Sequence, residues 1–154
     1  MIRTLIVAAV LATSAGAADA SSRTMVGKWD CIARDGKHLA IAMLLDYRQS
    51  GHFYHLANVA AGDRRGRLDA SIALRGRWFR DHGKLKETIK TSRLRSIAMN
   101  GADISKTPFG RQMARTMPRQ MSGPSDTSVT RVKFLARDKV ELRSGRMTAT
   151  CTRR

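Results

Sequence analysis

The strongest constraint on how this chain folds comes from its two cysteines, Cys31 and Cys151, because each has only the other as a possible partner. Cys31 lies in the first strand expected after the leader, 26–32, and Cys151 stands three residues from the C-terminus. A bridge between them would close a ring that holds nearly the whole domain. The pair therefore predicts that the first and last strands lie side by side.

The opening segment has the features of a secretory leader. Residues 1–3 form a short basic start, 5–11 form an apolar run too short to cross a bilayer, and 18–20 fit the small-x-small cleavage rule. We predict a signal peptide at 1–20 and a single domain at 21–154, in a periplasmic or secreted location where disulfides persist. The alternative is a retained N-terminal anchor. No later apolar run in the sequence reaches transmembrane length.

Positive charge dominates the composition, with 29 Lys and Arg against 12 Asp and Glu and a net charge of +17 at pH 7. Arginine suits bidentate contact with phosphate and carboxylate, so a partner rich in anions is one hypothesis: an anionic lipid, nucleic acid or an acidic protein. The alternative is charge spread over solvated faces. With 5% aromatic residues, the chain offers no stacking platform for specific nucleic-acid binding. The candidate anion-binding residues are Arg64, Arg65, Arg67, Arg111 and Arg115.

Short alternating segments separated by Gly, Asp and Ser turns are typical of a sandwich or small barrel. The expected strands are 25–33, 39–47, 52–59, 68–78, 84–90, 129–136, 139–143 and 147–152. Gly76 interrupts the clearest alternation and predicts a bulge before Trp78 returns to the inner face. The register of the second hairpin stays open. A two-residue turn pairs Tyr47 with Tyr54, whereas a three-residue loop with Gly51 as the bulge pairs Tyr47 with Phe53.

From about Ser92 to Asp126 the strand pattern lapses, and one helix is expected within this stretch. Thr107 can cap a helix that starts at Pro108 and ends before Pro118. Its apolar stripe, a candidate lid over one end of the barrel, consists of Phe109, Met113 and Met117. Arg111 and Arg115 form a basic stripe beside it.

Gly27-Lys28-Trp29 resembles the Gly-x-Trp signature of lipocalins. The resemblance implies that Trp29 plugs one end of a barrel and that an arginine near the last strand stacks over it. The candidate arginines are Arg143, Arg146 and Arg153, and the sequence does not choose among them.

A wider resemblance is to small bacterial secreted lipocalin-like (calycin-like) proteins of unknown function. Their Gly-x-Trp-x-Cys opening, Tyr-x-x-x-Gly-x-Phe hairpin, Gly-x-Trp and Leu-x-Glu motifs are matched at 27–31, 47–53, 76–78 and 85–87. It implies an all-β fold, a small antiparallel lipocalin-like barrel of about eight strands with one short amphipathic helix. The expected barrel plug is Gly27, Trp29 and Trp78. Such a likeness supports the fold more than the function.

No motif for chemistry stands out. His52 and His55, three residues apart on a strand, face opposite sides, so a metal site is not expected. The methionines at 113, 117 and 121 could bind Cu(I), but methionine at helical spacing favours packing. There is no Gly-x-Ser-x-Gly, and no free cysteine remains once the bridge forms. Glu87 and Glu141 are expected on polar strand faces, in cross-strand ion pairs. We therefore expect no catalysis and no cofactor.

These observations predict a monomeric, noncatalytic binding protein. A small apolar ligand would lie in the barrel beneath the candidate lid, in a cavity lined by Leu45, Ile72, Leu74 and Phe134. Alternatively, the arginine surface would hold an anionic envelope component. A third hypothesis is an interaction or inhibitor module whose basic loop, 63–67, enters an acidic cleft on another protein.

Overall fold

Alternation of apolar and polar residues along most of the chain produces one antiparallel sheet. A computed structural model describes residues 24–35, 38–64, 66–122 and 127–154. The predicted signal peptide and Arg65 lie outside the described residues. The elements are β1 (Gly27–Asp35), β2 (Leu39–Tyr47), β3 (His52–Asp63), β4 (Gly66–Asp81), β5 (Lys84–Met99), β6 (Ala102–Asp103), α1 (Pro108–Ser122), β7 (Thr127–Ala136), β8 (Lys139–Ser144) and β9 (Met147–Arg153).

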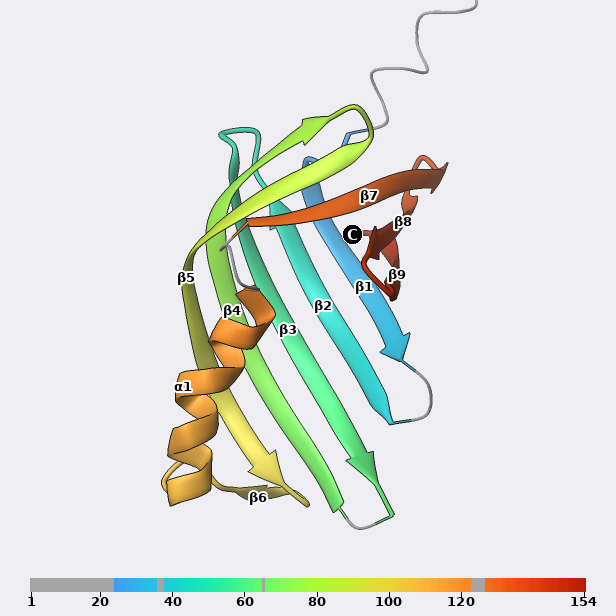
Figure 1. The fold of residues 1–154 in the computed structure, drawn as a ribbon. Coiled ribbons are helices and arrows are strands. Elements are labelled where there is room, and N and C mark those ends of the chain that lie inside the picture. The colour runs from blue at the N-terminus through green and yellow to red at the C-terminus, as the bar shows by residue number, and fades with distance from the viewer. Residues whose placement is uncertain (1–23, 36–37, 65, 123–126) are drawn as a thin grey trace, which may run out of the picture.

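The sheet closes into a barrel of eight strands (Figure 1). Each strand from β1 to β5 pairs with the next, β5 pairs with β7, and β9 returns to pair with β1. The short strand β6 adds to β5 and takes no part in the ring. The expected fold class, an all-β antiparallel barrel with one helix, is therefore confirmed.

The two predicted cysteines form the closing seam. Cys31 on β1 stands directly opposite Cys151 on β9, and the two are bonded with an S–S distance of 2.04 Å. Both side chains are buried in the core. The prediction that the ends of the domain lie side by side, joined by a disulfide, is confirmed.

The barrel closes around only part of its long strands. Strand β7 pairs with residues Lys84 to Thr88 of β5, and the rest of β5 continues beside β4 as an open extension of the sheet. Figure 1 shows α1 lying along this extension, below β7. The helix is fixed there partly by Ser92, whose Oγ donates a hydrogen bond of 3.2 Å to the carbonyl of Pro118.

The predicted lapse of strand pattern after Ser92 was wrong, because β5 runs on to Met99. Two register shifts explain the error. Arg75 pairs with Thr91 and Gly76 with Ile89, so one residue of β5 is left over at the Gly76 bulge; a second shift follows between Ser71 and Ile72. Each extra residue reverses the inward and outward positions that follow it, so a search for strict alternation loses the strand.

The predicted helix end before Pro118 was also wrong, since α1 continues through Pro118 to Ser122. The start is as expected. Thr107 Oγ1 accepts a hydrogen bond of 3.0 Å from the Gly110 amide, an N-cap contact. Proline costs the helix one backbone bond, but the buried position of Pro118 and the packing of Met117 against the core hold the last turn in place.

The second hairpin adopts the three-residue loop. Arg48 and His52 close it through the Arg48 amide, and Tyr47 pairs with Phe53. Gly51 has φ of +76°, a left-handed conformation that favours glycine. The Gly51 bulge therefore sets which residues of β3 face inward, among them Phe53 and His55.

Candidate functional site

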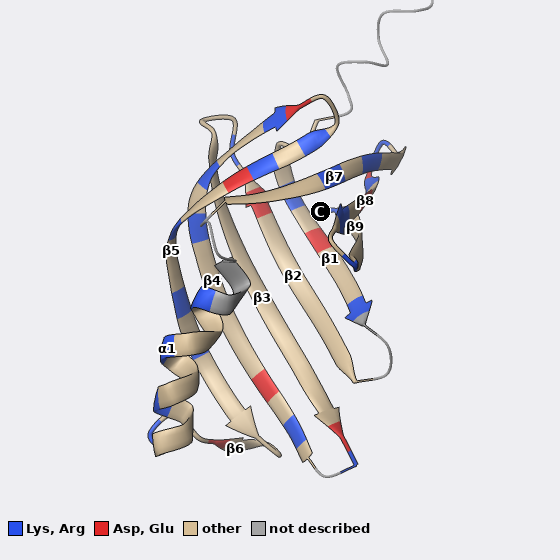
Figure 2. Ribbon diagram, viewed as in Figure 1, with Lys and Arg blue, Asp and Glu red and all other residues tan. Residues whose placement is uncertain are grey.

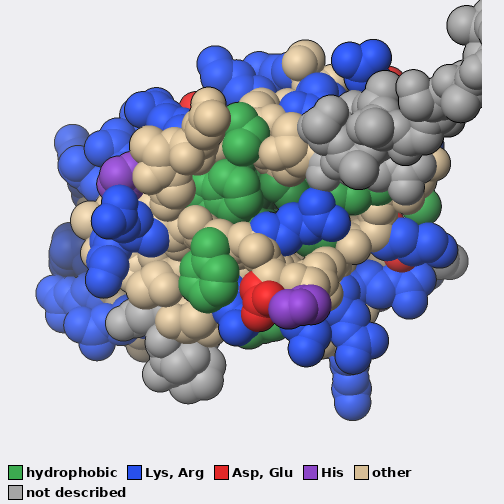
Figure 3. All heavy atoms as spheres, turned by 90° about the horizontal axis from the view of Figure 1, so that it is seen from above, with side chains coloured by type: hydrophobic (Ala, Val, Ile, Leu, Met, Phe, Trp, Pro, Cys, Tyr) green, Lys and Arg blue, Asp and Glu red, His purple; other side chains and the backbone are tan. Residues whose placement is uncertain are grey.

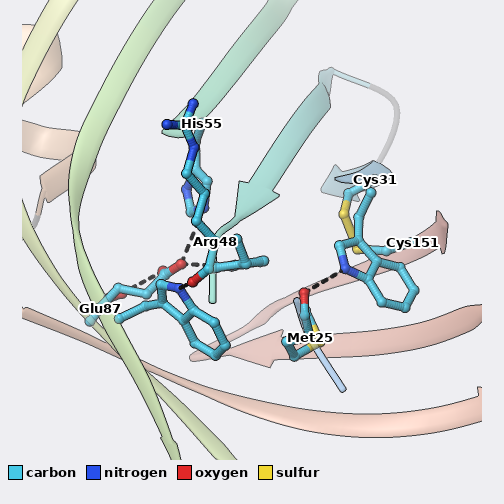
Figure 4. Close-up of polar contacts among 10 residues, drawn as sticks. Met25, Cys31, Arg48, His55, Glu87 and Cys151 are labelled. Atoms are coloured by element: carbon cyan, nitrogen blue, oxygen red, sulfur yellow. Dashed lines mark hydrogen bonds and ion pairs between the residues drawn. A yellow bond between two sulfur atoms is a disulfide. The ribbon is translucent and has the colours of Figure 1, made fainter. Parts of the chain in front are cut away.

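A tryptophan and an arginine pack against each other at one end of the barrel. Trp29 is fully buried, and its indole N–H donates a hydrogen bond of 2.9 Å to the Met25 carbonyl (Figure 4). The guanidinium carbon of Arg153 lies 4.2 Å from the centre of the Trp29 ring, a cation–π contact. Of the three candidate arginines, it is Arg153 that stacks over the tryptophan.

Arg153 also ties the start of the domain to its end. Its Nη1 and Nη2 donate hydrogen bonds, each of 2.6 Å, to the carbonyls of Val26 and Thr24. Gly27 has φ of +122°, and a Cβ at this position would lie 2.8 Å from Arg153 Nη1. Gly27 therefore makes room for the arginine that covers Trp29.

Trp78, the other expected plug residue, lies in a second aromatic group at this end of the barrel. Its indole N–H donates to the Arg48 carbonyl at 3.0 Å, and its ring meets that of Tyr47 edge on, with centroids 5.1 Å apart. Trp78 is half-buried. The two tryptophans are thus placed at the barrel end by hydrogen bonds to different backbone segments.

The barrel interior holds a cavity of about 210 Å³. Most of its lining is apolar and comes from the inward positions of the strands. Of the four side chains expected to line it, Leu45 and Leu74 do. Ile72 is buried in the core, and Phe134 packs edge on against Trp29, with centroids 6.5 Å apart.

A cluster of polar side chains interrupts this apolar lining (Figure 4). Glu87 on β5 accepts a hydrogen bond of 2.6 Å from the Tyr47 hydroxyl at Oε1 and one of 3.1 Å from the Ser128 hydroxyl at Oε2. His55 Nε2 lies 3.3 Å from Glu87 Oε1. The cluster is assembled from β2, β3, β5 and β7, so it exists only in the closed barrel.

The imidazole of His55 is buried and incompletely satisfied. The 3.3 Å separation from Glu87 brings the two groups into ion-pair range, but Nε2 has no hydrogen-bond partner of acceptable geometry among the described residues. Burial lowers the pKa of His55, while the nearby carboxylates of Glu87 and Asp46 act in the opposite direction. The ring is therefore neutral at neutral pH.

Tyr47 completes the cluster as a permanent donor. Burial raises the pKa of its phenol well above 10, and the negative charge of Glu87 and the hydrogen bond to it add to the shift. The phenol consequently stays protonated across the physiological range, and Glu87 is held as the acceptor.

The expectation that Glu87 lies on a polar face in a simple cross-strand ion pair was wrong. Its side chain points into the barrel and is 12% exposed. Glu141 is also paired, but within its own strand and not across strands as expected, because its Oε1 accepts a hydrogen bond of 2.8 Å from Arg143 Nε and both residues lie on β8. Only Glu87 meets a tyrosine, a serine and a histidine, and these come from three other strands.

The candidate lid residues lie along the open extension of the sheet. Met117 packs against the hydrophobic core, Met113 is half-buried and Phe109 is 48% exposed. None of the three appears among the residues that line the cavity. The side chain of Met121, considered with Met113 and Met117 for copper, lies outside what the structure describes.

Lys and Arg residues recur along most strands and along α1 (Figure 2), and seen from above their side chains lie all around the rim of the molecule (Figure 3). Arg64 and Arg67 line a groove with Arg34 at the β1–β2 and β3–β4 hairpins. Arg67 is paired there with Asp69 at 2.9 Å. Arg111 and Arg115 are exposed on α1, and Arg111 donates to the Lys106 carbonyl.

A third basic group was not expected from the sequence. It lies where the β2–β3 loop adjoins β4 and β5 and comprises Arg48, Arg75, Arg77 and Lys90. Arg75 lies over the ring of Tyr54 at 5.5 Å. The sequence could have predicted this group only with the β3–β4 register, which places Arg75 opposite Tyr54 and Arg77 opposite His52.

His52 is exposed and His55 is buried, as expected for opposite faces of one strand. Among the described residues, no group of three or more His, Cys, Asp or Glu side chains is placed to hold a metal ion. Within the same residues, no helix is both long and apolar enough to cross a membrane.

No protein-family model matches the sequence, and no curated protein matches it.

Proposed function

We propose that this chain is a noncatalytic binding protein that holds a small, largely apolar molecule inside its barrel. The observation that carries the proposal is the interior cavity of about 210 Å³, lined mainly by aliphatic and aromatic side chains. Concave, mostly apolar sites with a few polar groups are the usual form of small-molecule sites. A cavity of about 150 Å³ accommodates benzene, so this one suits a molecule of one or two rings.

Kinship with lipocalin-like proteins is part of the same proposal. It is supported by the contact between Trp29 and Arg153, because the Gly-x-Trp resemblance implies that an arginine near the last strand stacks over this tryptophan. The disulfide supports a periplasmic or secreted location, because such bonds persist in oxidising compartments.

A substitution that fills the cavity tests the proposal. Ala149 lines the cavity and is buried, whereas its neighbour Thr148 is exposed. Ala149→Leu adds apolar volume inside, and Thr148→Leu places the same side chain outside. Equilibrium dialysis against naphthalene should show binding to the wild type and to Thr148→Leu, and binding at least about tenfold weaker to Ala149→Leu. Equal binding by all three proteins, each checked to be folded, would refute an interior site.

A second candidate function is the binding of an anionic envelope component. The groove that contains Arg34, Arg64 and Arg67 favours it, because it gathers cations from two hairpins. Association with vesicles containing anionic lipid should weaken steeply between low and physiological salt. Binding that is insensitive to salt would exclude an electrostatic mechanism.

A further inference from the structure

The charge inside the barrel is opposite to the charge outside it. The whole chain carries +17. Among the described residues that line the cavity, Glu87 is the one acidic side chain, and none is Lys or Arg. The only other ionisable groups in the lining are His55 and Tyr47, which are both neutral at neutral pH for the reasons given above. An anion that is drawn to the surface would therefore meet a carboxylate inside.

The polar cluster also leaves hydrogen-bonding capacity unused. A carboxylate offers about four acceptor positions, and Tyr47 and Ser128 occupy two of them on Glu87. His55 Nε2 is buried without a partner of acceptable geometry. A buried polar atom left in this state destabilises a protein, so such atoms in native structures call for a specific explanation.

A ligand group placed beside Nε2 and Glu87 would supply the missing partner. The two atoms, His55 Nε2 and Glu87 Oε1, lie 3.3 Å apart and both belong to residues that line the cavity. A hydroxyl can donate to the carboxylate while it accepts from Nε2 when that atom carries the proton, or it can donate to Nε2 when that atom does not. An amine has enough protons to donate to both. A carboxylate ligand can do neither without placing two negative charges side by side.

We infer that the cavity selects small one- or two-ring molecules that carry a hydrogen-bond donor, a hydroxyl or an amine, and that it rejects carboxylates. The polar group lies beside His55 Nε2 and Glu87, within reach of both, and the rings occupy the space bounded by Leu45, Leu74 and Ala149. This inference rests on the proposed binding function and specifies its ligand class.

The neighbours of His55 keep it suited to this role. Its ring lies 4.3 Å from that of Phe53 and meets Tyr47 edge on at 5.2 Å, so two aromatic side chains fix its orientation. The charges that act on it are those of Glu87, inside the barrel, and Asp46, and both are acidic. The described part of the cavity lining therefore presents no cation with which an anionic ligand could pair.

Three probes that share one ring system and differ only in the substituent test the inference: naphthalene, 1-naphthol and 1-naphthoate. Dissociation constants from equilibrium dialysis at pH 7.5 should place 1-naphthol at least about tenfold tighter than naphthalene, as expected for a hydrogen bond to a charged acceptor. 1-Naphthoate should bind more weakly than naphthalene.

Two variants assign the effect to the cluster. Glu87→Gln keeps the shape and removes the charge, so the discrimination against 1-naphthoate should largely disappear. His55→Phe removes Nε2 while keeping the contact with Phe53, and should reduce the preference for 1-naphthol over naphthalene. Glu141→Gln, on the outside of β8, is the matched control and should change neither ratio.

The outcomes are distinct. If naphthalene and 1-naphthol bind equally, or if 1-naphthoate binds best, the selection rule is overturned while an interior apolar site still stands. If none of the probes binds, the proposed function fails and the selection rule fails with it. If Glu141→Gln changes the ratios as much as Glu87→Gln does, selectivity arises from the overall charge of the protein and the assignment to Glu87 is overturned.

Discussion

Removing the disulfide should destabilise the barrel by several kcal/mol, and almost all of the loss should come from the first cysteine removed. The bond joins residues separated by 120 positions. For a ring of this size the chain-entropy expression gives about 4.9 kcal/mol at 25 °C, and measured losses for native disulfides span about 2–5 kcal/mol. Without the bond, β1 and β9 are held by five paired positions and by packing.

The assay is urea denaturation followed by tryptophan fluorescence, on the wild type, Cys31→Ala, Cys151→Ala and the double variant. Each single variant opens the ring completely, so each should lose about 3–5 kcal/mol of unfolding free energy. The double variant should lose at most about 1 kcal/mol more, for the second buried sulfur. Single losses near 1 kcal/mol that simply add in the double variant would show that no bridge closes the ring, and would refute the reasoning.

Three other changes test the surroundings of the cavity. Arg153→Lys keeps the charge but loses the two guanidinium donors and the stacking over Trp29, so the unfolding free energy measured in urea should drop by about 1–3 kcal/mol. An unchanged value would show that the Arg153 contacts do not stabilise the fold. Gly76→Ala would drive a Cβ into the β5 backbone, so the unfolding free energy measured by thermal unfolding should fall by at least about 1–3 kcal/mol. A variant as stable as the wild type would show that the two backbones are not in close contact at Gly76. Burial lowers the pKa of His55, so below about pH 6.5 the unfolded state binds a proton that the folded state does not, and stability should decline until the folded imidazole also protonates. In His55→Phe the decline in unfolding free energy between pH 7.5 and 5.5 should be absent. If the decline persists in this variant, a group other than His55 causes it.

Sequence reasoning recovered the parts of the fold that depend on local alternation. Strand β2 shows why: Ile41, Leu45 and Tyr47 are buried on one face, as its period of two requires. It failed on β5, where extra residues at two register shifts reverse the alternation, and at Pro118, where packing outweighs helix propensity. Both failures occur where tertiary contacts override a local rule.

The polar cluster could not have been read from the sequence, because its members are far apart along it. Glu87 lies 40 positions from Tyr47 and 41 from Ser128. Glutamate between Leu85 and Ile89 was itself a signal, since a single charge on an otherwise apolar strand face is costly unless it is paired inside. Its partners become evident only when the register of the closed barrel is known.

Arg153, in contrast, could have been identified. Once Cys31 and Cys151 are paired across antiparallel strands, two residues before one cysteine stand opposite two residues after the other. This arithmetic pairs Trp29 with Arg153, as the structure does. The disulfide therefore carried enough information to choose among the three candidate arginines.

A crystal structure of the protein grown with 1-naphthol tests the central claim most directly, because it shows where the ligand lies and what its oxygen contacts. The account predicts that the rings fill the interior cavity and that the hydroxyl lies within hydrogen-bond distance of His55 Nε2 or Glu87. Naphthol found instead against α1 or on the outer face of the barrel, with the cavity empty, would contradict it.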